Sequence, residues 1–529
     1  MKPCRTQLRP ALSILLAAGI VPAQEQPNAN QRYGDVVGQD ARDYTISLRV
    51  DVAKKELVGI ANYTFVAEQP LTSLRLDARR SDTWQVTFFD HAGKEMATEW
   101  AEEHVVLTLP KPAAAGDQLQ FTAHLQGTPV DGFYFADNRY GEALAFTDHY
   151  SIRAHGWLPC EDNPADRAHF ALRLEYPEGM EAVAYGAMKS EPGEHRDGFR
   201  ALTATTDTEI PPYMFAIVVG PFARVHEDGD ARLVDHLVYA RDADKAAPLL
   251  THHAQWLHKM EQTFGPYAFG KYTTVQCPTR WGGFEAPGNV QLAEGLFDNA
   301  AGGTGTLAHE LVHMWFGDGV GYAEWREVWL AEGFASYFGP WLHADVGGPS
   351  LADSMRRMRT RWQQSFEGRT KTVRDDGFPH PDQALNSNTY PKGAWVLHML
   401  RKELGDEKFF AAIKAYYTAC RGRAVRTADF VDIVEHTAGT DLDWFFAQWL
   451  DRVGCPELKF TVGAEGVVVE QVQKGEPYTF WLTITAGHGE AQQRYPVRMT
   501  EARQVIAVDD VHQGFAVDPD VELLFRLAQ

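Results

Sequence analysis

Two histidines and a glutamate interrupt the apolar segment LAHELVHMWFGD at residues 307–318. Residues four apart in a helix project about 40° apart around its axis and about 6 Å apart along it, so His309 and His313 share one face and can bind one metal ion together. Zinc accepts imidazole ligands, and its catalytic sites combine three protein ligands with one open position. Glu310, beside the first histidine, is then placed to act as a general base toward water in that position.

The segment VWLAEGFASY supplies a carboxylate that completes such a site. Glu332 lies 19 residues after His313, in a second apolar segment with helical character. An antiparallel helix would bring Glu332 to the histidines, whereas a buried glutamate without a partner would be costly. The alternative, that the histidines are exposed or hydrogen-bonded within a core, leaves Glu332 unexplained. We therefore predict a site for one zinc ion formed by His309, His313 and Glu332.

The composition is that of a globular protein with several domains. A chain of 529 residues exceeds one ordinary core, and 44% hydrophobic with 23% charged residues is typical of soluble domains. The net charge of −21 argues against binding to nucleic acid or to anionic membranes, because both need clustered positive charge. No segment after the N-terminus is long and apolar enough to span a bilayer, and the oligomeric state stays open.

The first 23 residues have the pattern of a secretory signal. Lys2, Arg5 and Arg9 precede the apolar run ALSILLAAGI, and small residues follow up to Ala23. The apolar stretch falls short of the roughly 20 residues that cross a bilayer, which disfavours a membrane anchor. We predict cleavage after Ala23 and export to the periplasm or out of the cell.

The remaining cysteines indicate no metal site. They are widely spaced, and none forms a CxxC pair. One or two disulfides in an oxidising compartment stay open, and the sequence does not decide their pairing. The four residues are Cys160, Cys277, Cys420 and Cys455.

Hydrophobic periodicity divides the mature chain into three parts. Residues 24–225 contain segments that alternate with period two, among them DYTISLRV and FALRLEYP, and predict an N-terminal β domain. Residues 226–454 carry apolar positions at three- and four-residue steps, as in HAQWLHKMEQTF and KGAWVLHMLRKEL, and predict a mainly helical catalytic domain. Alternation returns in residues 455–529, which predict a small, β-sandwich-like domain. The expected fold class is multidomain α+β.

These motifs resemble those of the zinc aminopeptidases related to aminopeptidase N. HELVHMWFGD…WLAEGFASY is similar to the family pattern HExxHxWFGN…WLNEGFA, with the same spacing between the second histidine and the glutamate. WLPCEDNP and IPPYMFAIVVGPF resemble further family segments in the same order, so the resemblance covers nearly the whole mature chain. It implies a β domain, a thermolysin-like catalytic domain and a small β domain, without the long helical C-terminal domain of many relatives.

The resemblance also implies roles for two further positions. WGGFEAPGN is similar to the exopeptidase motif GxMEN, so Glu285 aligns with the glutamate that binds the substrate's α-amine, and Gly282 and Gly283 belong to the same substrate-binding strand. TYPKGAWVLHML is similar to YxKGAxxLxML, so Tyr390 aligns with the tyrosine that donates to the oxyanion. Without the resemblance, Glu285 would be interpreted as a solvated loop residue and Tyr390 as a helix residue with its hydroxyl in water.

Two departures from the family pattern bear on substrate preference. Phe284 and Ala286 stand where the exopeptidase motif has Met and Asn, and the position of a second amine-binding acid in many relatives falls on Tyr150, with Asp148 nearby as a candidate substitute. We predict a zinc-dependent aminopeptidase that releases N-terminal residues from peptides with a free N-terminus. The alternatives are a zinc peptidase that cleaves blocked or internal bonds, and a catalytically silent binding protein of the same fold.

Overall fold

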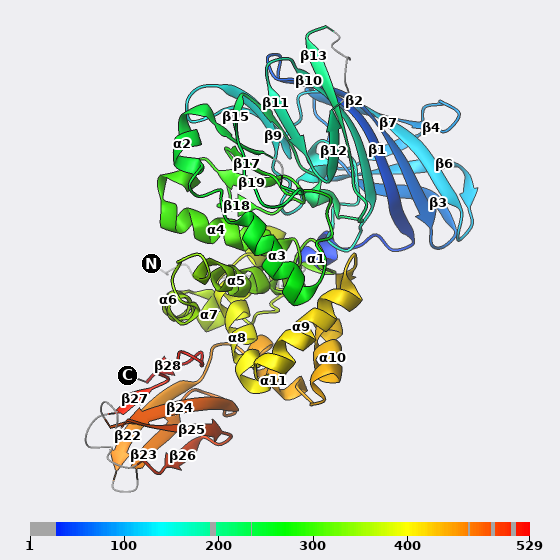
Figure 1. Cartoon of the computed structure of the whole chain (residues 1–529). Coiled ribbons are helices and arrows are strands. Elements are labelled where there is room, and N and C mark those ends of the chain that lie inside the picture. The colour runs from blue at the N-terminus through cyan, green and yellow to red at the C-terminus, as the bar shows by residue number, and fades with distance from the viewer. Residues whose placement is uncertain are drawn as a thin grey trace, which may run out of the picture.

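The computed structural model describes residues 28–190, 197–233, 235–463, 466–487, 492–508 and 515–528. The predicted signal segment lies outside these residues. β strands fill one end of the molecule, helices its middle and a second, smaller group of strands its other end (Figure 1). Among the described residues, no helix has both the length and the apolar character needed to cross a bilayer. Cys160, Cys277, Cys420 and Cys455 are all buried and unpaired.

The N-terminal part is organised around a seven-stranded sheet with the order β12-β13-β10-β1-β2-β7-β4. Its strands are β1 (Gln39–Asp51), β2 (Glu56–Ala67), β4 (Trp84–Asp90), β7 (Gln118–Gly127), β10 (His169–Pro177), β12 (Ala187–Ser190) and β13 (Phe199–Thr205). Alternate residues of β1 are buried, as its period-two pattern predicts. On the buried face, Tyr44 of β1 stacks on Phe170 of β10 with ring centroids 4.7 Å apart.

Two smaller sheets complete the N-terminal part. One has the order β3-β6-β5 and the other the order β11-β14-β9-β8. Their strands are β3 (Leu71–Asp77), β5 (Thr98–Trp100), β6 (His104–Ala113), β8 (Phe133–Asp137), β9 (Ala143–Thr147), β11 (Glu181–Ala184) and β14 (Ile217–Gly220). The predicted N-terminal β domain is therefore confirmed as a β-rich region.

A five-stranded sheet joins the N-terminal part to the helices. Its order is β15-β16-β17-β19-β18, with β15 (Phe222–Val225), β16 (His236–Tyr239), β17 (Thr274–Cys277), β18 (Gly283–Phe284) and β19 (Val290–Ala293). β15 pairs antiparallel with β16, Phe222 lying opposite Tyr239. The expected domain boundary after residue 225 lies between these two strands.

The predicted helical region contains most of the helices. They are α2 (Ala243–Ala246), α3 (His253–Phe264), α4 (Ala300–His313), α5 (Trp329–Ala344), α6 (Leu351–Gln364), α7 (Glu367–Thr370), α8 (Gly393–Leu404), α9 (Asp406–Cys420), α10 (Thr427–Ala438) and α11 (Asp443–Leu450), while α1 (Ala29–Arg32) lies near the N-terminus. The segment HAQWLHKMEQTF forms α3, and its apolar residues at helical spacing are buried. α4 begins after Asn299, whose side chain accepts a hydrogen bond from the Gly302 N–H.

The C-terminal part consists of two sheets, β26-β23-β22-β28 and β25-β24-β27. The strands are β22 (Glu457–Gly463), β23 (Gly466–Gln471), β24 (Phe480–Ala486), β25 (Gln493–Met499), β26 (Arg503–Ile506), β27 (Phe515–Val517) and β28 (Arg526–Leu527). These sheets contact the helical part through α6, where Arg359 donates to Asp518 at 2.6 Å and Gln363 Nε2 donates to the Phe525 carbonyl at 2.6 Å. The C-terminal part thereby fixes one face of α6.

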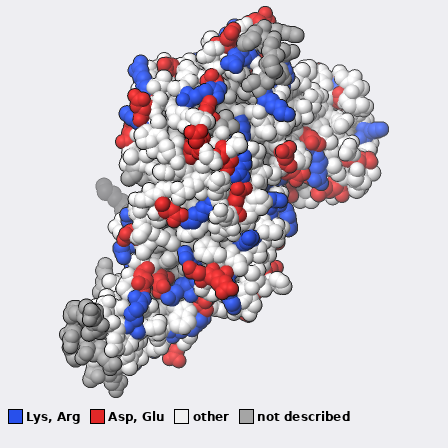
Figure 2. Space-filling model, viewed as in Figure 1, with Lys and Arg blue, Asp and Glu red and all other residues white. Residues whose placement is uncertain are grey.

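Charges of both signs are interspersed over the molecular surface in view (Figure 2). Blue and red residues alternate along the N-terminal, helical and C-terminal parts, and no extended positive area covers this face. The face in view therefore presents no basic stripe of the kind by which proteins bind the nucleic-acid backbone.

Candidate active site

A cavity of about 810 Å³ lies between the five-stranded sheet and the helices. Residues 281–285 and Tyr150 form one wall, and α4 and α5 form the floor. The opposite wall comes from α6, α7 and the segment that leads into η7, a turn of π-helix at Asn388–Lys392. Strand β18 packs against α4, whereas α6 packs against α5 and η7. The cavity is therefore a cleft with the two helices of the predicted metal site at its base.

Three ligand atoms meet in this floor. His309 Nε2 lies 3.2 Å from His313 Nε2 and 3.3 Å from Glu332 Oε2, and His313 Nε2 lies 3.5 Å from the same oxygen. Ligands at about 2.0–2.1 Å from one tetrahedral ion are separated by about 3.3 Å, so the observed triangle has the size that a zinc ion requires. The three residues are also among the groups of the described residues whose atoms could hold a metal.

Hydrogen bonds around the triangle leave lone pairs on His313 and Glu332 free. His313 Nδ1 lies 3.1 Å from the Phe316 carbonyl oxygen, so it carries the proton and donates it, and Nε2 presents its lone pair to the site. Glu332 Oε2 is buried and accepts no hydrogen bond within the described residues. A buried carboxylate oxygen without a hydrogen-bond donor is costly unless a cation compensates its charge. The donor set therefore fits a divalent metal.

The electrostatics of the floor point the same way. Burial raises the pKa of Glu332, but the neighbouring His313 and His309 outweigh it and lower that pKa to about 2. Burial, together with the charges of Glu285 and Glu332, raises the pKa of Glu310 well above its ordinary value. Burial also raises the pKa of Glu285, although His313 opposes the effect. Three buried carboxyl groups thus share one region, where a divalent cation would offset their mutual repulsion.

Close packing of glycines brings the catalytic elements together. A Cβ atom at Gly393 would lie 2.9 Å from the Gly333 Cα atom, so only glycine allows α8 to approach α5 this closely. This approach places η7 beside the floor, where the Tyr390 ring lies parallel to the His309 ring with centroids 6.0 Å apart. A Cβ atom at Gly283 would lie 2.2 Å from Glu310 Oε1. The strand that precedes Glu285 therefore runs directly past the Glu310 carboxylate.

The structure brings all eight residues selected from the sequence into this one cavity. They are Gly282, Gly283, Glu285, His309, Glu310, His313, Glu332 and Tyr390. Glu285, Glu310, His313 and Glu332 are each less than a tenth exposed. Such burial of charged groups in a cleft is typical of a functional site rather than of a solvated surface.

Asp148 does not join the cavity. It is buried and accepts hydrogen bonds from Arg280 Nε at 3.2 Å and from Trp281 Nε1 at 3.1 Å. Tyr150 lines the cavity in its place, with its ring edge-on to the Trp281 ring. Asp148 thus supports the wall that carries Glu285, and Glu285 is the carboxylate that this wall presents to the cavity.

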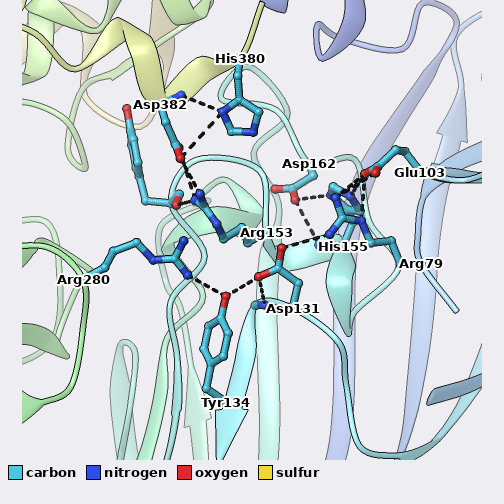
Figure 3. Close-up of polar contacts among 12 residues, drawn as sticks. Arg79, Glu103, Asp131, Tyr134, Arg153, His155, Asp162, Arg280, His380 and Asp382 are labelled. Carbon is cyan, nitrogen blue, oxygen red and sulfur yellow. Dashed lines mark hydrogen bonds and ion pairs between the residues drawn. The ribbon is translucent and has the colours of Figure 1, made fainter. Parts of the chain in front are cut away.

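A polar network from the N-terminal part holds both walls (Figure 3). Arg280 Nη2 donates to the Tyr134 hydroxyl at 2.8 Å, and that hydroxyl donates to Asp131. Arg153 forms an ion pair with Asp382, which lies in the segment before Tyr390. Sequence reasoning missed these positioning residues, since no motif links partners that lie more than 100 positions apart in the chain.

The comparisons with known proteins agree with this architecture. The model of the Peptidase M1 N-terminal domain matches residues 40–213, and that of the Peptidase family M1 domain matches residues 249–449. The two matched regions cover most of the chain and both belong to one family. This protein is a member of peptidase family M1.

Individual relatives are distant in sequence. Aminopeptidase M1-D of Oryza sativa subsp. japonica is 27% identical over 467 residues, which cover 82% of this chain and 52% of that protein. Aminopeptidase N of Streptomyces lividans is 28% identical over 383 residues, or 65% of this chain and 43% of that protein. This chain thus spans about half the length of the curated relatives that it matches.

The match to a solved structure extends over nearly the whole length of the matched chain. The M1 zinc metallopeptidase of Deinococcus radiodurans superimposes with a TM-score of 0.66 at 24% identity, over 80% of this chain and 96% of that one. A mutant of the same enzyme, bound to a Tyr-Ser-Ala substrate, gives the same TM-score at 25% identity. These structures support the same arrangement of a β domain and a helical catalytic domain.

Proposed function

We propose that this protein is a zinc-dependent aminopeptidase that removes N-terminal residues from peptides. The observation that carries the proposal is the triangle of His309, His313 and Glu332, with ligand atoms 3.2–3.5 Å apart beside a buried glutamate at the base of a cleft. Family membership supports the same conclusion, as do relatives named aminopeptidases and a relative described as a zinc metallopeptidase.

His309, His313 and Glu332 would hold the zinc ion. When bound, zinc polarises a carbonyl group and lowers the pKa of water, which makes peptide hydrolysis feasible near neutral pH. Glu310 lies against the backbone of Gly283, so its carboxylate borders the path of the substrate. There it would accept a proton from the attacking water and transfer that proton to the leaving nitrogen.

Tyr390 and Glu285 would act on opposite ends of the scissile residue. The Tyr390 hydroxyl would donate a hydrogen bond to the oxygen that becomes negative when water adds to the carbonyl. Glu285 would pair with the protonated α-amine, and Gly282 and Gly283 would let the substrate backbone lie close to this strand. Because Asp148 is paired with Arg280, Glu285 would bind the amine beside Tyr150 rather than beside a second acid.

We also propose the division of the chain into domains and its export from the cytoplasm. Three domains would comprise residues 24–225, 226–454 and 455–529, with β15 at the end of the first domain pairing to the five-stranded sheet of the second, and the two C-terminal sheets would form a sandwich-like unit. Residues 1–23 would direct export and be removed, which would deliver the enzyme to peptides outside the cytoplasm.

The direct test compares a free aminoacyl-anilide with its N-acetylated form. We expect hydrolysis of the free amine, loss of activity with a chelator and recovery with Zn²⁺. Glu285→Gln should raise KM for the free substrate by about 10- to 100-fold, since a charged hydrogen bond contributes about 1.5–3 kcal/mol. Equal turnover of both anilides would instead favour a peptidase that ignores the α-amine, and bound zinc without any turnover would favour a silent binding protein.

A further inference from the structure

Arg361 is the one lysine or arginine among the described residues that line the cavity. It is exposed at the wall formed by α6. No described side chain pairs with its guanidinium, although other arginines of the same helix have partners: Arg356 donates to Asp353 at 2.6 Å and Arg359 to Asp518 at 2.6 Å. An arginine without a partner in a substrate cleft is free to bind an anionic group of the substrate.

The packing of α6 explains why Arg361 faces the cavity. Arg359 and Gln363, two residues before and after it, both donate to the C-terminal part. Residues two apart in a helix point about 200° apart, so Arg361 lies on the opposite face. Met358, three residues earlier on that face, also lines the cavity. The C-terminal part therefore orients Arg361 toward the cleft by holding the back of its helix.

Arg361 and Glu285 belong to opposite walls. Glu285 follows β18, which packs against α4, whereas α6 packs against α5 and η7. In Figure 1, β18 and α6 lie on either side of α5. A peptide whose amine pairs with Glu285 and whose first peptide bond lies over the metal ligands would extend its C-terminal side toward α6.

We propose that Arg361 binds the C-terminal carboxylate of short peptide substrates, so that the enzyme prefers oligopeptides whose two termini both fit in the cleft. This inference rests on the proposed aminopeptidase function. Glu285, Glu310, Glu332 and Glu367 all line the same cavity and would repel a peptide carboxylate. Arg361 supplies the compensating charge at the wall that the C-terminus reaches. Since each extended residue adds about 3.3–3.6 Å, the contact selects a limited range of peptide lengths.

The test compares free-acid peptides with their C-terminal amides. For a series from dipeptide to hexapeptide, we expect kcat/KM of the wild type to favour the acid about tenfold at one length, mainly through KM, because a charge-assisted hydrogen bond is lost in the amide. Arg361→Gln should bring the acid-to-amide ratio close to one, and Arg361→Lys should keep part of the preference. Arg356→Gln, on the same helix but paired outside the cavity, is the matched control and should leave the ratio unchanged.

Further readouts separate this inference from the proposed function. Aminoacyl-anilides carry no carboxylate, so Arg361→Gln should hydrolyse them at the wild-type rate. Calorimetric binding of the same acid and amide pairs measures the contact without turnover. A ratio near one in the wild type, or a preference that persists in Arg361→Gln, would overturn the inference while leaving anilide hydrolysis intact. The inference would also be overturned if a peptide amide with an internal glutamate bound as well as the free acid. Arg361 would then bind side-chain carboxylates rather than the C-terminal carboxylate.

Discussion

Among the described residues, two clusters combine one glutamate with two histidines, and their surroundings differ. In the first, His309, His313 and Glu332 form the floor of the cleft. In the second, Glu227 Oε2 lies 2.7 Å from His253 Nδ1 and 3.2 Å from His236 Nε2. Glu227 Oε1 also accepts a hydrogen bond from the Ala254 N–H at 3.1 Å.

The difference lies in where the imidazole protons point. His236 and His253 direct N–H groups at Glu227, so its carboxylate is satisfied by donors within the core. His313 directs its N–H at a backbone carbonyl and turns its free nitrogen toward Glu332, whose Oε2 accepts no hydrogen bond from the residues that the structure describes. The same residue types therefore form a hydrogen-bonded core cluster in one place and a ligand set in the other. Metal binding needs free lone pairs and open space, and the first cluster has both because it borders the cleft.

Removing a metal ligand should have the largest effect. His313→Gln is expected to reduce bound zinc from about one per chain to near zero and to abolish turnover, because two ligands do not retain a catalytic zinc ion. His236→Gln, the matched change in the second cluster, should leave the zinc content per folded chain unchanged. Metal analysis of both purified variants checks the comparison. Zinc loss from His236→Gln would contradict the assignment of the second cluster as a hydrogen-bonded core cluster.

The next largest effect is expected at the general base. Glu310→Gln keeps the side-chain shape but cannot accept the proton, so kcat should fall by about 10²–10⁴-fold while zinc remains bound. Steady-state kinetics with an aminoacyl-anilide, combined with metal analysis, separates this result from ligand loss. Full activity in the variant would remove Glu310 from the mechanism.

Tyr390→Phe should follow with a loss of about 100- to 1000-fold in kcat, the usual cost of one oxyanion donor. KM and zinc content should change little, since the ring and its packing on His309 are kept. Tyr150→Phe, in the opposite wall, is the control for removing a cavity hydroxyl. Equal losses in the two variants would show that Tyr390 has no special role.

The smallest effect on activity is expected from Glu227→Gln, which should instead cost about 1–3 kcal/mol of stability because one imidazole N–H loses its acceptor. Burial raises the pKa of Glu227, but hydrogen bonds from His236 and His253 outweigh it and hold that pKa well below its ordinary value of 4.5. The stabilisation is therefore complete above pH 4.5 and is lost as the pH falls further. Urea unfolding at pH 7 and pH 4 should show the variant's deficit shrinking in acid, and a constant deficit would contradict the assignment.

The parts of the site that follow from local geometry could be predicted from the sequence. His309 and His313 are four residues apart on one helix, so their convergence needs no tertiary information. To predict Glu332 as a third ligand, we also had to infer that α5 packs against α4. The apolar residues around Glu332 in the sequence indicated this packing. The β-rich and helical regions followed from hydrophobic periodicity for the same reason, because periods of two and 3.6 are local properties of strands and helices.

The parts that depend on long-range pairing could not be predicted. Asp148 was a candidate for amine binding, but Arg280, 132 residues later, pairs with it behind the wall. Arg361 carried no motif, and only the contacts of α6 with the C-terminal part reveal the face on which it lies. The sheet that β15 joins is likewise decided by pairing across a hairpin rather than by its own sequence.

Anomalous diffraction at the zinc absorption edge tests the central claim most directly. Crystals of the purified protein should give one strong peak, about 2.0–2.2 Å from His309 Nε2, His313 Nε2 and Glu332 Oε2. A zinc-loaded crystal with no peak at this position, or with its peak between Glu227, His236 and His253, would contradict the account.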